Sequence, residues 1–450
     1  MKNPRFLWSV ELVALCFALS VTAPAAAQAL EDSVVIVTSF PKDLTNAFKQ
    51  AFEAKHTGVT VEVLNKKTTA GVKFLQETAG NNTTDLFWAS APDAFEVLKG
   101  DGLLMKYQLK ATGIPELIGS YPIHDPDGYY KGFAGAGYGI MWNERYVKAK
   151  QLPVPKEWSD LAKPVYHGHV GMSAPSRSGT THLTVETVLQ GEGWEKGWAT
   201  WKDIAGNFNT VTERSFGVPD GVNSGQFGIG IVIDFFGLSS KGSGFPVDFV
   251  YPSVTTLVPA NIGIVNNAPH PQAAGEFIEF LMSGEGQEIL LDPKIRRLPI
   301  RPDIYAKAPA GFPNPFEDKS IGAAVKFDVD KSKERYNLVN SLFDVMITYR
   351  LDDLRAATNA IHKAEAALAK KSNDKAAQLV AEARELVAAT PITEAQSLDK
   401  DFAAVFKKKR KKATDTLTGR QAEVEAEWDT VIKDNYVKAK AAAEQALSLL

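Results

Sequence analysis

Short β-branched runs alternate with amphipathic stretches over residues 33–300. Residues 33–38 are apolar and β-branched, which predicts a buried strand. After a break at Pro41, apolar residues recur at helical spacing up to Phe52. Residues 59–64 then form a second strand-like run. This order predicts a strand–helix–strand unit, in which the two strands lie parallel.

The same alternation continues along the chain and predicts an α/β fold. Further apolar runs end at turn-forming or polar residues, and several of them are followed by a helical pattern. A helix over 273–282, for example, is expected to start after Pro271. The remaining candidate strands are residues 86–89, 168–173, 209–212, 228–233 and 260–265.

The chain changes character from about residue 336. Ala, Lys, Glu and Leu dominate, and apolar residues recur at helical spacing between Leu379 and Leu386. Pro391 and Gly419 divide this region into about three helices. The composition favours long helices or a small helical bundle.

The N-terminus has the pattern of an export signal. Lys2 and Arg5 precede a mostly apolar run over 6–21 and a small-residue run over 23–29. We therefore expect residues 1–29 to be a cleaved signal peptide and the mature protein to be periplasmic. A membrane anchor is the alternative, but the apolar run is short of the roughly 20 residues that a spanning helix needs.

Composition and charge exclude several classes of function. A chain of 450 residues exceeds one ordinary hydrophobic core, so two or more folding units are expected. The net charge of −3 does not suggest a nucleic acid partner. The single cysteine, Cys16, lies in the signal segment, which leaves no disulfide or thiolate metal site. The basic run 407–412 is either a solvated helix face or a docking surface for an acidic partner or anionic lipid.

The polar segment 176–182 is the strongest candidate for ligand binding. It follows a predicted strand and opens a predicted helix, where free backbone N–H groups attract anions. Ser178, Thr180, Thr181 and His182 are therefore expected to bind an anion or sugar hydroxyls, and Arg177 is expected to add a charge-assisted hydrogen bond. Ordinary helix capping is the alternative, but it explains only one or two of these polar residues.

Other polar residues follow strands at equivalent places. Ligands of open parallel sheets bind beyond the carboxyl ends of the strands, where Ser39, Ser90, Arg214 and Ser215 are expected to lie. Asp234 ends an apolar strand, so its charge is expected to be paired or to face the ligand.

Catalytic motifs do not occur in this sequence. It has no phosphate-binding or dinucleotide glycine loop in the right context and no nucleophile elbow. His167 and His169 have no further metal ligand in the pattern and favour a surface or core role. We expect no catalytic residues, metal or cofactor, and a hydrolase is the least favoured class.

A series of segments over residues 33–350 resembles family 1 extracellular solute-binding proteins of ABC transporters. The shared order of these segments makes the resemblance more specific than any one of them. They are residues 39–41, 57–61, 84–90, 102–104, 125–130, 139–143, 158–161, 267–274, 286–287 and 296–299.

The resemblance implies the two-lobe periplasmic binding fold with mixed sheets, and a ligand held in the cleft between the lobes. Lobe one is expected to comprise 30–138 and 258–299, and lobe two 139–257 and 300–350. Residues 351–450 form a helical extension. A ligand that touches both lobes stabilises the closed state, which the transporter recognises.

The resemblance is nearest to the phosphoglycerate and hexose-phosphate binders and the ferric-iron binders. Ferric binders place two tyrosines where this chain has Phe235 and Phe236, and phenylalanine cannot coordinate iron. The resemblance therefore implies a small anionic solute, an organophosphate above all. It also implies an ABC membrane permease as partner, together with a membrane sensor kinase as a second one.

Two classes of alternative stay open. One is a receptor for ferric iron, a polyamine or a phosphonate. The other is a periplasmic signalling protein that acts through its C-terminal helices. If these helices serve only partners, deletion of residues 370–450 is expected to leave solute binding intact.

Overall fold

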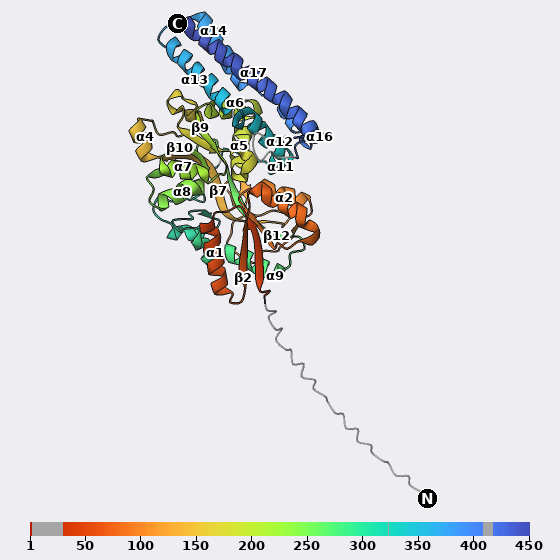
Figure 1. The fold of residues 1–450 in the computed structure, drawn as a ribbon. Helices are drawn as coiled ribbons and strands as arrows, with labels where there is room; N and C mark the ends of the chain where they lie inside the picture. The colour runs from red at the N-terminus through yellow and green to blue at the C-terminus, as the bar shows by residue number, and fades with distance from the viewer. Residues whose placement is uncertain (2–29, 323, 408–416) are drawn as a thin grey trace. The chain divides into compact units, whose positions relative to one another are not determined.

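The computed structural model describes residue 1 and residues 30–322, 324–407 and 417–450. The expected signal peptide and most of the basic run 407–412 lie outside these residues. Residues 31–450 form one compact unit, in which helices cover a central sheet (Figure 1).

The sheet is mixed and runs in the order β2-β1-β3-β12-β7-β10-β8-β9. The strands are β1 (Ser33–Thr38), β2 (Thr60–Asn65), β3 (Leu86–Ala89), β4 (Leu104–Met105), β5 (Leu117–Ile118), β6 (Tyr121–Pro122), β7 (Lys131–Asn143), β8 (Val170–Ser173), β9 (Phe208–Thr212), β10 (Ile229–Ile233), β11 (Val247–Val250), β12 (Leu257–Val265) and β13 (Leu298–Pro299). The helices are α1 (Lys42–Lys55), α2 (Thr68–Thr78), α3 (Pro92–Gly100), α4 (Glu144–Lys150), α5 (Gly179–Glu192), α6 (Trp194–Ala205), α7 (Gly217–Ser224), α8 (Asp234–Gly242), α9 (Pro271–Met282), α10 (Gly284–Ile289), α11 (Val329–Glu334), α12 (Tyr336–Phe343), α13 (Leu351–Leu368), α14 (Asp374–Ala388), α15 (Glu394–Ser397), α16 (Lys400–Ala403) and α17 (Arg420–Ser448).

Strand β7 joins two groups of strands. Its residues up to Gly137 pair with β12, and its residues from Tyr138 onward pair with β10 and β11. We call β2, β1, β3 and β12 the first half-sheet, and β10, β8 and β9 the second half-sheet. Strands β1, β2 and β3 are parallel to one another, as are β8, β9 and β10. The predicted strand–helix–strand unit and the α/β class are therefore confirmed.

Strand β7 itself was not predicted, because glycine usually weakens a strand and this segment contains several. The structure gives the reason for the glycines. A Cβ built on Gly139 would lie 2.1 Å from the carbonyl oxygen of Val250, and one on Gly132 would lie 2.1 Å from that of Ile123. The missing side chains allow neighbouring backbone to approach a strand that is buried along most of its length.

The C-terminal helices pack on α6, which shares a hydrophobic core with strands of the second half-sheet. Trp194 and Trp198 of α6 share one hydrophobic core with Leu379 of α14 and Trp428 of α17. In Figure 1, α13, α14 and α17 lie together beyond α6. The hydroxyl of Tyr436 on α17 also donates a hydrogen bond of 2.8 Å to a buried carbonyl oxygen of residue 346. The predicted helical bundle is confirmed, and it forms part of the same compact unit.

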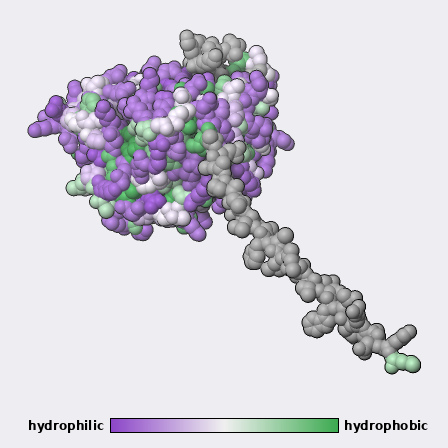
Figure 2. Space-filling model, turned by 90° about the horizontal axis from the view of Figure 1, so that it is seen from below, coloured by the Kyte–Doolittle hydropathy of each residue, from purple (hydrophilic) through white to green (hydrophobic). Residues whose placement is uncertain are grey.

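The outer surface is mainly polar. Figure 2 shows a largely hydrophilic face, on which hydrophobic residues gather in small patches. Within residues 30–322, 324–407 and 417–450, no helix combines the length and apolar character needed to cross a bilayer.

Candidate functional site

A small polar cavity lies where the two half-sheets meet. Segments that follow β1, β2 and β3 provide one wall, and segments that follow β8, β9 and β10 provide the other. This is the expected place for a ligand, beyond the carboxyl ends of the strands. The lining residues are Ser39, Phe40, Pro41, Lys67, Thr68, Ser90, Arg177, Ser178, Thr180, Arg214, Ser215, Phe216, Phe235 and Phe236.

The structure brings most of the predicted site residues together at this cavity. Ser39 and Ser90 reach it from the first half-sheet, while Ser178, Thr180, Arg214 and Ser215 reach it from the second. These segments are far apart in the sequence, so the parallel-strand argument placed them correctly.

The start of helix α5 forms one corner of the cavity. The Ser178 side chain is the N-cap and accepts a hydrogen bond of 3.2 Å from the backbone N–H of Thr181. Capping therefore accounts for Ser178, as the alternative interpretation held. The N–H groups of Gly179 and Thr180, in the first turn, have no partner within the helix. Their orientation makes this corner favourable for an anion.

The charge of the lining is positive. Lys67, Arg177 and Arg214 line the cavity, and no carboxylate is among the lining residues. Glu213, nearby, forms ion pairs with Lys67 at 3.3 Å and with Arg177. The Arg214 guanidinium stacks 4.5 Å from the centre of the Phe216 ring, and its burial lowers its pKa. The three positive charges exceed the single negative charge of Glu213, and this excess favours an anionic ligand.

The cavity is narrow. Its volume is about 20 Å³, which is room for one water molecule. The hydroxyl oxygens of Ser90 and Thr180 lie 2.9 Å apart and link the two walls directly. The Lys67–Glu213 ion pair also connects them. A solute larger than a water molecule therefore does not fit the cavity in this arrangement.

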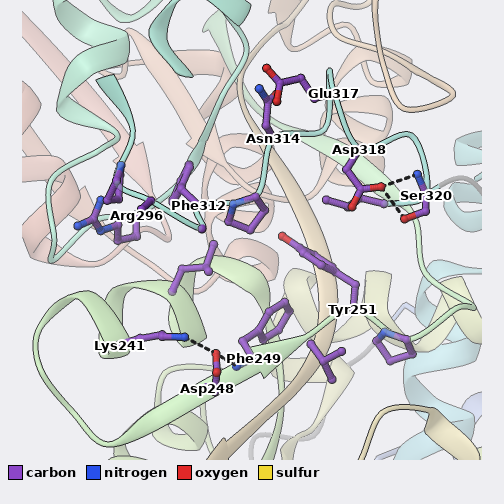
Figure 3. Close-up of a pocket in the computed structure, with 18 of the residues that line it drawn as sticks. Lys241, Asp248, Phe249, Tyr251, Arg296, Phe312, Asn314, Glu317, Asp318 and Ser320 are labelled. Carbon is purple, nitrogen blue, oxygen red and sulfur yellow. Dashed lines mark hydrogen bonds and ion pairs between the residues drawn. The ribbon is translucent and has the colours of Figure 1, made fainter. Parts of the chain in front are cut away.

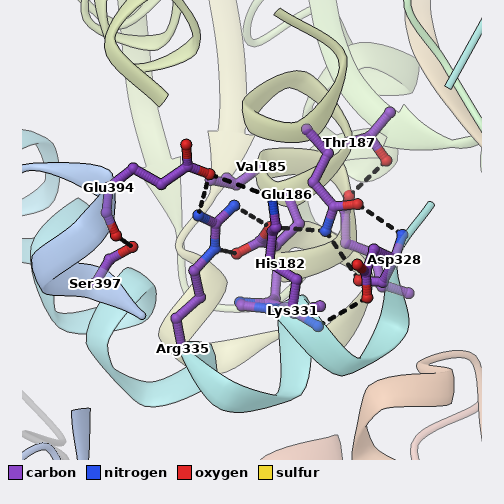
Figure 4. Close-up of polar contacts among 12 residues, drawn as sticks. His182, Val185, Glu186, Thr187, Asp328, Lys331, Arg335, Glu394 and Ser397 are labelled. Atoms are coloured by element: carbon purple, nitrogen blue, oxygen red, sulfur yellow. Dashed lines mark hydrogen bonds and ion pairs between the residues drawn. The ribbon is translucent and has the colours of Figure 1, made fainter. Parts of the chain in front are cut away.

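Thr181 and His182 do not reach the cavity, contrary to the prediction. Helix geometry turns both side chains into the protein. The Thr181 hydroxyl is hydrogen-bonded to that of Ser173. His182 is fully buried, with its ring nitrogens 2.9 Å from Asn340 Oδ1 and 3.1 Å from Ser332 Oγ. Figure 4 shows His182 among the buried polar contacts that join α5 to the C-terminal segments.

Asp234 does not line the cavity, so of its two expected roles the structure shows the paired one and not the ligand-facing one. It is buried, and it accepts hydrogen bonds from the backbone N–H groups of Gly137 and Phe235 and from the Tyr251 hydroxyl, at 2.7–2.9 Å. Burial raises the pKa of this carboxyl to about 6, although these hydrogen bonds oppose the shift. A carboxylate at the end of a buried strand must be satisfied locally, and these three partners satisfy it.

Several lining residues were missed at the sequence level. Lys67 and Thr68 follow β2, so the rule that singled out Ser39 and Ser90 applies equally to them. Arg177 was not missed, because it lies inside the polar segment 176–182 and was expected to add a charge-assisted hydrogen bond. Phe216 follows the predicted Arg214–Ser215 pair, but no pattern in the sequence indicates that it faces the cleft.

A larger cavity of about 1160 Å³ lies elsewhere on the molecule. Tyr251, Phe312 and Arg296 are among the residues around it (Figure 3). None of the predicted site residues lines it. Within the described part of the chain, no group of three or more His, Cys, Asp or Glu side chains is placed to hold a metal ion.

Comparison with protein families and curated proteins gives a consistent result. The family model described as bacterial extracellular solute-binding protein matches residues 81–319. The phosphoglycerate transport regulatory protein PgtC of Salmonella typhimurium is 30% identical over 389 residues, which cover 85% of this chain and 91% of that protein. Iron uptake protein A1 of Synechocystis is 25% identical over 248 residues, which cover 52% of this chain and 67% of that protein.

Solved structures share the fold. The periplasmic binding protein AfuA from Actinobacillus pleuropneumoniae, with fructose-6-phosphate bound, superposes with a TM-score of 0.61 at 20% identity. The match covers 70% of this chain and 98% of AfuA. Iron-bound HitA from Pseudomonas aeruginosa gives a TM-score of 0.55 at 17% identity, over 67% of this chain and 94% of HitA.

Proposed function

Because this chain belongs to the bacterial extracellular solute-binding protein family, we propose that it is the periplasmic receptor that captures an organophosphate for an ABC importer. Membership of the family implies a small solute and a membrane permease as partners. The names of two similar proteins support the organophosphate. PgtC is named for phosphoglycerate transport, and the AfuA structure is described with fructose-6-phosphate bound.

The positive lining of the cavity is the observation that carries this proposal. The phosphate lies at the start of α5, where backbone N–H groups and the Thr180 hydroxyl donate hydrogen bonds. Arg214 adds a charge-assisted hydrogen bond from the same side. Ser39 and Ser90 complete the contact from the opposite wall.

The two half-sheets act as the two lobes of the receptor. The partner change of β7 between Gly137 and Tyr138 supports lobe boundaries at 30–138 with 258–299 and at 139–257 with 300–350. A solute that touches both walls stabilises the closed form by its differential affinity for that form.

Ferric iron is the less favoured ligand. Phe235 and Phe236 line the cavity with rings that have no metal-ligating atoms, and no carboxylate is among the lining residues. The similar proteins are named as transport or binding proteins, which supports a receptor over an enzyme. The name of PgtC, a transport regulatory protein, supports a membrane sensor kinase as a second partner.

Calorimetric titration with 3-phosphoglycerate and with glucose 6-phosphate tests the proposal. Thr180→Val removes a hydroxyl that lines the cavity and should weaken binding on the order of 10-fold or more. Thr187→Val is the matched control, because the Thr187 hydroxyl donates to the backbone of Leu183 further along the same helix. Unchanged affinity of Thr180→Val, or no binding of either solute by the unmodified protein, would contradict the proposal.

A further inference from the structure

Arg297 lies in an unusual environment beside the cleft. It follows α10, directly before β13, and only 1% of it is exposed. Its guanidinium carbon lies 3.5 Å from the centre of the Phe235 ring and 4.5 Å from that of Phe40. Among the described residues, none of its side-chain nitrogens has a hydrogen-bond partner. Buried polar groups are rarely left unpaired, so this arginine requires an explanation.

Its charge is not compensated by a direct ion pair within the described residues. Asp234 interacts with it electrostatically, but the oxygens of that carboxylate accept from Gly137, Phe235 and Tyr251. Burial lowers the pKa of Arg297 to about 9, so the group still carries its proton at neutral pH. Stacking on aromatic rings offsets only part of the cost of a buried cation.

The geometry shows which contacts remain available. The guanidinium carbon lies over the Phe40 and Phe235 rings, and these ring contacts leave all of its N–H donors without a hydrogen-bond partner among the described residues. The N–H groups lie in the plane of the guanidinium and form a fork, which matches the two oxygens of a carboxylate.

Open space lies next to Arg297. Arg297 lines a cavity of about 180 Å³, roughly the volume of six water molecules in the liquid. Pro41, Phe216, Phe235 and Phe236 line both this cavity and the cleft cavity, so the two spaces share a wall. Asp43 and Asp220 also line the cavity beside Arg297, but both residues are exposed, so water screens their charges.

We propose that Arg297 is a second anion-recognition point, which binds a carboxylate of the same solute whose phosphate lies at the start of α5. This inference rests on the proposed function and narrows it. The solute class is phosphorylated hydroxy acids, because a phosphate ester without a second anionic group leaves the buried guanidinium unpaired. Arg297 is then the residue that determines specificity.

Calorimetric titration with 3-phosphoglycerate and glycerol 3-phosphate separates the two contacts, since only the first carries a carboxylate. The unmodified protein should prefer 3-phosphoglycerate by on the order of 10- to 100-fold. Arg297→Met keeps an unbranched chain between the rings and should remove this preference, with affinity for glycerol 3-phosphate unchanged. Arg297→Lys keeps the charge without the fork and should give an intermediate preference.

Arg296→Met is the matched control, because Arg296 lines the separate cavity of Figure 3 and stacks near Phe312. This variant should retain the full preference for 3-phosphoglycerate.

Equal affinities of the unmodified protein for the two solutes would overturn the role of Arg297 and leave the organophosphate receptor standing. An equal loss for both solutes in Arg297→Met would also overturn it, since the residue would then act only structurally. If neither solute binds the unmodified protein, the role of Arg297 fails, and the titration with glucose 6-phosphate then decides whether the organophosphate receptor fails with it. Thermal unfolding checks that each variant is folded. If Arg297→Met does not fold, the preference of Arg297→Lys for 3-phosphoglycerate decides whether Arg297 binds the carboxylate.

Discussion

The Ser90 Oγ and Thr180 Oγ1 atoms lie 2.9 Å apart, and this hydrogen bond joins the end of β3 to the start of α5 across the cleft. Both residues are buried, at 3% and 9% exposure. The contact therefore holds the cavity closed and occupies two hydroxyls that the solute is proposed to use. Solute binding must exchange this hydrogen bond for others.

Ser90→Ala should shift the protein toward an open form. Loss of one hydrogen bond of about 1 kcal/mol changes the open-to-closed ratio roughly fivefold. Spin labels at Lys73 and Lys196, both exposed, report the distance between α2 and α6 by pulsed electron resonance. Ser224→Ala is the control, because that hydroxyl bonds only within α7. Identical distance distributions for the two variants would refute this role of Ser90.

The stability of the protein should depend on pH through Asp234. Its pKa of about 6 in the folded state lies above the unfolded value of about 3.9, so the folded state retains a proton that the unfolded state releases. This contribution is complete below about pH 4 and is lost as the pH rises through 6, a change of about 3 kcal/mol. Urea unfolding between pH 4 and 7 should show a smaller decline in Asp234→Asn. The exposed Asp43→Asn should behave like the unmodified protein, and a decline of the same size in Asp234→Asn would contradict the assignment.

Breaking the buried ion pair between Glu186 and Arg335 should strongly destabilise the folded protein. Both side chains are fully buried, and the guanidinium donates two hydrogen bonds of 2.9 Å to the carboxylate (Figure 4). Glu186→Gln leaves a buried cation with one partner fewer and should cost about 3–5 kcal/mol in denaturant unfolding. Glu195→Gln, on the exposed side of α6, should cost under about 0.5 kcal/mol.

The combined change Glu186→Leu and Arg335→Met removes both charges and should recover much of that stability. If the double variant is no more stable than Glu186→Gln, packing rather than charge dominates this site.

Deletion of residues 370–450 should abolish folding of the receptor. The deletion removes α14 and α17, whose Leu379 and Trp428 share a core with Trp194 and Trp198. The exposed apolar surface should cause aggregation, measured by size-exclusion chromatography and circular dichroism. The expectation that binding survives this deletion treated the helices as a separate unit. A soluble fragment that unfolds cooperatively and binds solute would restore that expectation.

Much of the fold could be predicted from the sequence, because the local patterns agree with the tertiary packing. The alternation over 33–64 predicted β1, α1 and β2, since strand and helix periods are read from neighbouring residues. Strand β7 was missed because its glycines are explained only by distant backbone, such as the Val250 carbonyl. Local propensity was overridden there by tertiary contact.

The candidate site was only partly predictable for a similar reason. The rule of strand ends located Ser39, Ser90 and Thr180, because topology alone brings these ends together. Whether a polar side chain turns toward the cleft or into the core depends on packing. His182 lies within the same polar segment as Thr180, yet Asn340 and Ser332, far along the chain, hold it inside. The pairing of Asp234 with Tyr251 is equally non-local.

The shared core between the second half-sheet and the C-terminal helices has a mechanical consequence. Helix α17 has 29 residues, which gives it a length of about 43 Å. It is fixed to the second half-sheet by this core, so it must turn as a rigid lever when the cleft opens or shuts. A rotation of about 15°, as in known domain movements, would sweep the distant tip of such a lever through about 11 Å. If the cleft opens and shuts as proposed, the C-terminal ends of these helices would therefore move farther than the residues at the solute.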